Sequence, residues 1–321
     1  MLFRSTRSDA AQTWFDQGLA LVYGFNHAEA VRSFREAARL DPECVMAWWG
    51  IAYANGADIN DREMRPKEAR EAWDASREAL RLVEAGVRVH PVEAALARAV
   101  AARYAWPAPE DRGHLDRTYA NAMLDVWRAF PEDPDVGALY AESLMNLQPW
   151  DLWTAAGEPK GRVLEIVATL EEVLRLQPDH PGACHFYIHT VEASPDPARA
   201  VAAAEVLEER IPGSGHLVHM PSHIYVRVGR YADASDVNER AVAADRAYFG
   251  AGGVPGFYLV YFAHNLHMLA FSAMMEGRYG AALEAARTLE REMPESFLRE
   301  ATGFVDGRMA APNDVMWRVG R

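Results

Sequence analysis

Histidine is the residue type whose spacing points most directly to chemistry, because seven of the eleven histidines lie in three short segments. The segments read CHFYIH at residues 184–189, HLVHMPSH at 216–223 and HNLH at 264–267. Spacings of three, four and seven residues place the histidines of each segment on one face of a helix. Imidazole is a common metal ligand, so the pattern predicts a metal site. Its candidate ligands are His185, His189, His216, His219, His223, His264 and His267.

Two of these segments repeat at a fixed distance along the chain. His185 and His219 are 34 residues apart (219 − 185), and His189 and His223 are separated by the same distance. Such a period is typical of helical repeats, in which each helix pair packs on the next one. Packed neighbouring helices lie about 8–10 Å apart, so imidazoles on adjacent helices can converge on one ion at about 2.0–2.1 Å.

Imidazole nitrogens without thiolates suit several transition metals and do not choose among them. We expect copper, iron or zinc as the cofactor. Glu192 stands three residues after His189 and shares its helix face. Its carboxylate suits three roles, namely a metal ligand, a partner that orients an imidazole, or a general base, and Glu192 is our candidate catalytic residue.

The rest of the chain predicts the helices that must position these histidines. Apolar residues three and four apart dominate stretches rich in Ala, Leu, Glu and Arg, and no long stretch alternates with period two. We therefore expect an all-α protein. Helix breaks are expected at Pro42, Pro66, Pro91, Pro107 to Pro109, Pro131 to Pro134, Pro178, Pro212 and the Gly-rich loop at 250–255.

Residues 14–42 show the register of a 34-residue helix pair, with large, small, small, aromatic, small and proline positions at Trp14, Gly18, Ala30, Phe34, Ala37 and Pro42. This segment resembles the tetratricopeptide repeat (TPR) family. The histidine segments also resemble those of bacterial His-rich TPR proteins of undefined activity. The resemblance implies an all-α, TPR-like right-handed helical solenoid. We expect a single solenoid over residues 1–321, with irregular repeats in 1–130 and the histidine-lined concave face in 131–321.

The resemblance also implies which side chains face the groove of the solenoid. In the first helix of each TPR unit, the second, fifth, ninth and twelfth places point into this groove. All seven candidate histidines take second, fifth or ninth places, and Glu192 takes a twelfth place. Cys184 takes an apolar fourth place, where we expect burial and not metal binding. The turn GRY recurs at 229–231 and 277–279, and we expect the Gly-rich loop near 250–256 to absorb 14 residues in excess of one repeat.

Two further candidates are weighed against a purely structural role. His27 takes a place where the repeat commonly has a packing aromatic residue, so packing and a role at the far end of the groove are equally good interpretations. The segment WDLW at 150–153 either covers the groove or fills a gap between units, and Asp151 is the residue to test. His90, His114 and His180 are explained by helix capping or solvent exposure.

Composition excludes several classes of function. The chain carries 33 basic and 46 acidic residues, a net charge of -13, so nucleic acid and anionic membranes are poor partners. Two distant cysteines, Cys44 and Cys184, form no disulfide framework. With no long apolar run and no secretory segment, we expect a cytoplasmic protein. A Gly-rich phosphate loop, a nucleophile elbow and an HExxH motif are all absent from the sequence.

We therefore expect a metal-binding protein, and specifically a transition-metal-dependent oxidoreductase that acts on a small molecule or peptide in the concave groove. Stacked repeats bury their own core and need no metal for stability, which favours catalysis over a structural metal. One alternative is a non-catalytic scaffold that binds a peptide or protein partner. Another is a haem-binding protein with histidine as axial ligand. The metal, the substrate, the oligomeric state and enzymatic activity itself stay open.

Overall fold

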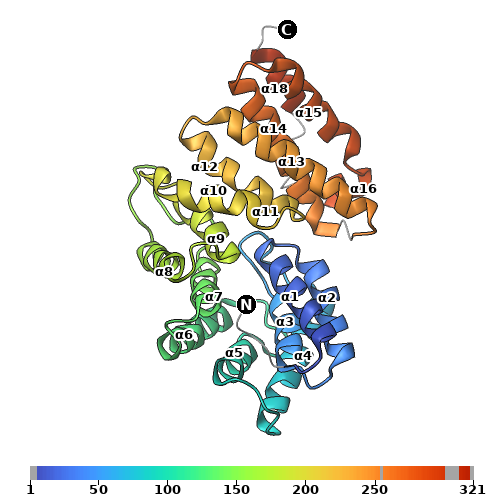
Figure 1. Cartoon of the computed structure of the whole chain (residues 1–321), viewed down its shortest axis with the longest axis vertical. Coiled ribbons are helices and arrows are strands. Elements are labelled where there is room, and N and C mark those ends of the chain that lie inside the picture. Colours follow the sequence, from blue (N-terminus) through green and yellow to red (C-terminus); the bar gives the residue numbers. More distant parts are fainter. Residues whose placement is uncertain (1–5, 254–255, 301–310, 319–321) are drawn as a thin grey trace. The chain divides into compact units, whose positions relative to one another are not determined.

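The computed structural model describes residues 6–253, 256–300 and 311–318. Apart from one isolated bridge between Trp153 and Pro159, the regular structure of this part is helical (Figure 1). The helices form two compact units, unit 1 (Met1–Ser194) and unit 2 (Pro195–Arg321). Each unit is a TPR-like stack of helix pairs, which confirms the predicted all-α fold class. The continuity of one solenoid over residues 1–321 stays a prediction.

Unit 1 is built from consecutive helix pairs. Helices α1, α3, α5 and α7 each pack on the helix that follows, and α1 also contacts α3, α3 contacts α5, and α7 contacts α9. The odd-numbered helices are therefore the inner ones, and α1 lies beside α9 as well. The helices are α1 (Asp9–Tyr23), α2 (His27–Leu40), α3 (Val45–Ala54), α4 (Pro66–Glu84), α5 (Pro91–Ala101), α6 (Gly113–Ala129), α7 (Pro134–Met145), α8 (Val163–Leu176) and α9 (Pro181–Val191).

Proline sets many of these helix boundaries, as the sequence predicts. Helices α4, α5, α7 and α9 each begin with a proline, whose missing N–H leaves no hydrogen bond unmade at that position. The residues before two of them cap their helices. Nδ1 of His90 accepts a hydrogen bond from the amide of Val92, and Nδ1 of His180 accepts one from the amide of Ala183. The expected capping role of these histidines is confirmed.

The first helix pairs pack around Phe34, a fully buried residue of α2. Gly18 of α1 and Gly50 of α3 lie against its ring, and a Cβ atom at either glycine would stand 2.5–2.6 Å from the nearest ring carbon. That distance is well inside van der Waals contact, so α1 and α3 approach α2 this closely only because both positions lack a side chain. The predicted packing roles of Gly18 and Phe34 are confirmed.

Gly50→Ala is therefore expected to destabilise the protein by about 1–3 kcal/mol, because the added methyl group forces Phe34 or α3 to move. Helix propensity alone would favour alanine by about 0.5–1 kcal/mol, so the sign of the effect separates the two causes. Chemical denaturation measures the free energy of unfolding. Gly280→Ala in α15, where an added Cβ meets open space, is the matched control, and equal effects of both changes would contradict the packing argument.

Unit 2 continues with helix pairs of less regular length. Its elements are η1 (Pro197–Ala200), α10 (Val201–Arg210), α11 (Gly215–His219), α12 (Pro221–Arg227), α13 (Tyr231–Gly250), η2 (Gly256–Tyr258), α14 (Leu259–Met275), α15 (Tyr279–Glu292), α16 (Glu295–Glu300) and α18 (Ala311–Arg318). Helices α11 and α12 are two parts of one interrupted helix, because Met220 keeps helical angles while Pro221 lacks the N–H of a regular turn. Helix α13 packs on α11, α12 and α14.

Both predicted GRY turns are present in unit 2. Gly229 and Gly277 have the same left-handed φ of +81°, and α13 and α15 begin two residues later. The 14 residues in excess of one repeat were expected in the Gly-rich loop near 250–256, but the structure places them differently. Helix α13 has 20 residues against 14 in α15, so part of the excess length is helical and not in the loop. Val254 and Pro255 of that loop lie outside the described residues.

No helix among the described residues is both long enough and apolar enough to cross a membrane.

Candidate metal centre

Three of the predicted ligands converge in unit 2. His219 ends α11, His223 lies in α12 and His264 lies in α14. Nε2 of His223 is 3.0 Å from Nε2 of His219 and 3.2 Å from Nε2 of His264. One nitrogen of each ring lies within 4.8 Å of the others. The interruption at Pro221 sits between the first two histidines, and the i, i+4 spacing still brings their rings together.

The hydrogen bonds around His219 fix which of its nitrogens carries the proton. Its Nδ1 is 2.6 Å from Oδ1 of Asn238, and Nδ2 of Asn238 donates to the carbonyl of Ala234, so the amide turns its oxygen toward the ring. An amide oxygen only accepts, so Nδ1 of His219 is the donor. In the neutral ring, Nε2 therefore carries a lone pair toward His223.

These distances suit a bound ion as well as a shared proton. Two nitrogens bound tetrahedrally to one ion at about 2.0–2.1 Å lie about 3.3–3.4 Å apart. The Nε2 separations of 3.0 and 3.2 Å are close to that value. Nε2 of His223 faces the Nε2 atoms of His219 and His264 at once. Three converging imidazole nitrogens are a donor set that a metal ion can use.

A buried carboxyl group supports the same helices from α13. Asp245 is fully buried, and it accepts hydrogen bonds from the hydroxyl of Tyr258 at 3.1 Å and from Nδ2 of Asn265 at 2.8 Å. Asn265 is the residue after His264, and Tyr258 also accepts a hydrogen bond from the backbone amide of His216. Asp245 thus ties α13 to the segments that carry two histidines of unit 2.

Burial raises the pKa of Asp245 to about 7, although the hydrogen bonds from Tyr258 and Asn265 act in the opposite direction. The carboxyl group is therefore partly protonated near neutral pH. Because the folded-state pKa lies above the unfolded value of 3.8, the folded state binds the extra proton between these two pH values. Its contribution to stability is complete below about pH 4 and is lost as the pH rises to about 7.

Asp245→Asn is expected to change the pH dependence of stability in that window. Relative to the unchanged chain, the unfolding free energy of the variant should rise by about 3 kcal/mol between pH 4 and pH 7, because an amide carries no charge at either pH. Urea denaturation at both pH values measures the difference between the two proteins. A difference that stays constant over this range would show that Asp245 is ionised in both states.

Two predicted ligands of unit 2 lie outside the three-histidine cluster. The ring of His216 lies 5.9 Å from the ring of His219 and 4.4 Å from that of Tyr261. His267, one turn after His264, lines a separate cavity of about 130 Å³ together with Phe271 of α14 and Asp314 and Val315 of α18. The structure does not bring His267 together with His219 and His223.

The remaining predicted residues lie in unit 1, with His185 and His189 in α9 and Glu192 at the C-terminal end of α9. Nδ1 of His185 is 2.6 Å from the carbonyl oxygen of Tyr23, and Nδ1 of His189 is 3.0 Å from Oε1 of Glu192. Both partners are acceptors, so in each neutral ring the proton sits on Nδ1 and the lone pair on Nε2. The two rings are 4.9 Å apart. Of its three candidate roles, Glu192 has the geometry of the partner that orients His189.

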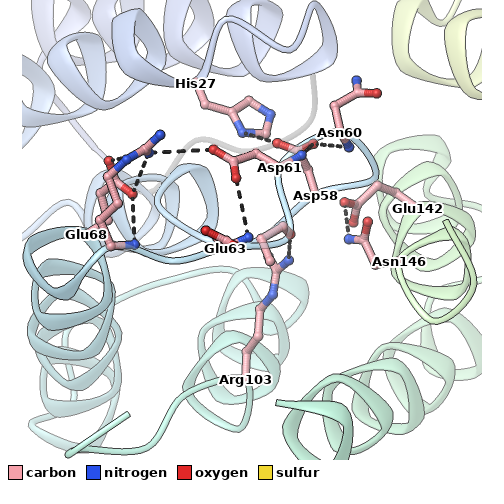
Figure 2. A network of polar contacts seen from close by, with 11 residues as sticks. His27, Asp58, Asn60, Asp61, Glu63, Glu68, Arg103, Glu142 and Asn146 are labelled. Atoms are coloured by element: carbon pink, nitrogen blue, oxygen red, sulfur yellow. Dashed lines mark hydrogen bonds and ion pairs between the residues drawn. The ribbon is translucent and has the colours of Figure 1, made fainter. Parts of the chain in front are cut away.

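The other predicted residues of unit 1 have structural partners. Trp150 lies edge-on to His189 with ring centres 5.0 Å apart, and its indole donates to the carbonyl of Ile59. Asp151 forms an ion pair with Lys160. His27 lies 3.2 Å from Asp58 and joins the polar network drawn in Figure 2. Cys184 is buried, as expected.

Two supporting residues were missed in the sequence, Asn238 and Asp245. Both are fully buried, and their separation of seven residues places them on one face of α13. A polar pair at this spacing within an otherwise apolar helix face was the available signal. The sequence does not show which histidine each residue supports, because those contacts join separate helices.

Comparison with known proteins assigns no family. No protein family matches the chain, and no curated protein matches it. Among solved structures, the chain is similar to the human IFIT1 dimer with PPP-AAAA, with a TM-score of 0.44 and 14% identity over 98% of this chain and 72% of that one. It is also similar to the TPR domain of P58(IPK), with a TM-score of 0.25 and 12% identity over 97% and 99% of the two chains. Likeness this low assigns no ligand or activity.

Proposed function

We propose that the chain binds a transition-metal ion through Nε2 of His219, His223 and His264. The observation that carries the proposal is the convergence of these three nitrogens, with separations of 3.0 and 3.2 Å from His223. The contact between Asn238 and Nδ1 of His219 supports it, because metal-binding histidines commonly donate their other N–H to such an acceptor. Copper, iron and zinc are the candidate ions.

We further propose that the bound ion is catalytic. Structural zinc sites have four protein ligands, whereas catalytic ones have three and keep one position open. Three histidines match the second arrangement. Such an ion supplies a Lewis acid, and with copper or iron also a redox centre, which gives an oxidoreductase acting on a small molecule or peptide. The repeat core is already buried without the ion, so a purely structural role is the weaker alternative.

The same tautomer pattern supports a further ligand role for His185 and His189 in unit 1. Each has Nδ1 on an acceptor, Tyr23 carbonyl or Glu192 carboxylate. Two imidazoles provide only half of a usual first coordination shell. We therefore expect this pair to contribute to metal binding less than the cluster of unit 2 does.

Protein purified without metal-affinity resin is expected to contain about one copper, iron or zinc ion per chain, and His219→Ala/His223→Ala should lose it. Elemental analysis measures the stoichiometry. His114→Ala is the matched control, because His114 is an exposed histidine of α6, and it should retain the metal. Full retention of metal in the double variant would refute the proposed site.

The absorption spectrum of the same samples separates the alternatives. Haem would give its own intense visible bands, which a directly coordinated ion does not. A protein without stoichiometric metal or haem would leave the peptide-binding scaffold as its function, since helical repeats also present extended binding surfaces.

Asn238→Leu is expected to lower metal affinity by about 10–100-fold, because it removes the acceptor that holds the proton on Nδ1 of His219. Asn238→Asp keeps the acceptor for Nδ1 of His219 but, like Asn238→Leu, loses the donor to the carbonyl of Ala234, so it should retain more metal affinity than Asn238→Leu. Competition with a chromophoric chelator measures both affinities. If the two variants lose affinity equally, the effect comes from packing and not from the hydrogen bond.

A further inference from the structure

A second polar site lies in unit 1, and its lining residues include none of the histidines of α9. A cavity of about 200 Å³ opens among the loop that follows α3, the loop that precedes α6 and the end of α7. This volume is below the range of about 300–1,000 Å³ that is typical for drug-sized ligands, so only a small molecule fits. The side chains that line it include Asp58, Arg62, Glu110, Arg112, Asp116 and Asn146.

Two buried charged residues, Arg103 and Glu142, contact residues of the cavity wall (Figure 2). Arg103 is only 2% exposed, donates to the carbonyl of Ala57 and lies 4.8 Å from the ring of Tyr119. Glu142 is also buried, and burial raises its pKa despite the nearby Arg103 charge. Asn146 donates its amide hydrogen to Glu142. These contacts hold Ala57 and Asn146, two residues of the cavity wall, and fix the orientation of the Asn146 amide.

The cavity wall offers a permanent negative charge at Asp58. Burial alone would raise the pKa of Asp58, but His27 and the backbone amides of Asn60 and Asp61 hold it below its usual value. The carboxylate therefore stays ionised at neutral pH. Asp116 adds another carboxylate, which is 3.4 Å from Arg112, and Glu110 and Asp111 are the other acidic residues of the wall.

The wall also offers positive charge and unmet hydrogen-bonding capacity. Arg62 is exposed and has no ion-pair partner in the part of the chain that the structure describes. Two buried wall atoms, the acceptor Oδ1 of Asn146 and the donor Nε of Arg112, have no hydrogen-bond partner among the described residues. A small shift of either side chain presents the atom to a ligand. A ligand that satisfies both atoms must carry a hydrogen-bond donor and a hydrogen-bond acceptor.

We infer that this cavity binds a small zwitterion with an ammonium and a carboxylate group, the chemistry of a free α-amino acid. The ammonium group lies against Asp58, Asp116 and the amide oxygen of Asn146. The carboxylate lies against Arg62 and Arg112, since guanidinium donors match carboxylate geometry. A ligand with only one of the two charges leaves one side of the wall unmatched.

Calorimetric titration of the full chain with L-alanine and, separately, with L-glutamine tests the inference. L-lactate has a hydroxyl group in place of the ammonium group of alanine, and L-alaninol has a hydroxymethyl group in place of its carboxylate. Both are expected to bind at least about tenfold more weakly than alanine. Lactate or alaninol binding as tightly as alanine would overturn the zwitterion assignment. No binding of either amino acid up to about 10 mM would show that the cavity holds only water.

Variants connect the binding to the named residues. Arg62→Gln should lower the affinity for L-alanine by at least about tenfold. The affinity for L-alaninol should not change, since alaninol has no carboxylate. Arg39→Gln also removes one positive charge, but from the exposed face of α2. It should leave the affinities for L-alanine and L-alaninol unchanged. Equal weakening by the two variants would overturn the site and leave only a general charge effect.

Amino acids also bind free metal ions, so the titration is repeated with His219→Ala/His223→Ala. The inference predicts unchanged L-alanine binding in this variant, because the cavity belongs to unit 1. Loss of binding there would assign the signal to the metal and overturn the cavity site. The two proposals therefore fail independently.

Discussion

The packing of inner helices against their neighbours decides which side chains meet in each unit. A helix pair leaves one apolar face uncovered, and only the next pair covers it. In unit 1 this requirement places Phe34 between Gly18 and Gly50. In unit 2 it places α13 against α11, α12 and α14 at once. Because α13 touches all three helices, its inner face supports the histidines that the other helices carry, so the candidate site depends on packing before it depends on imidazole chemistry.

The sequence predicted the features that repetition and local chemistry determine. Prolines at helix starts follow from the missing N–H, and the capping of α5 and α9 by His90 and His180 involves only neighbouring residues. The meeting of His219 and His223 follows from their i, i+4 spacing. The repeat register then indicated that His264, on the first helix of the next repeat, faces the same side, and the structure brings its ring to His223.

Features that depend on departures from the repeat were not predictable in the same way. His267 takes a place equivalent to that of His219, but in the structure it lines a cavity with α18. Nothing in the spacing of the histidines indicates where that later helix packs. Likewise, Arg103 and Glu142 are far apart in sequence, and the effect of the Arg103 charge on Glu142 follows from how several helix pairs stack. Local sequence patterns therefore do not predict the long-range partners of buried polar groups.

The surroundings of the three-histidine cluster also bear on what a bound ion would do. Asn238, which orients His219, is neutral, and Asp245 takes up a proton near neutral pH because burial raises its pKa to about 7. Three neutral imidazoles and these supports add little negative charge to the site. A divalent ion held there would keep most of its own charge, which favours a strong Lewis acid over a neutralised structural ion. A carboxylate such as Glu192, which lies on His189 in unit 1, creates the opposite setting. The two histidine groups of this chain therefore differ in electrostatics, although His219 in one and His185 and His189 in the other all have Nδ1 on an acceptor.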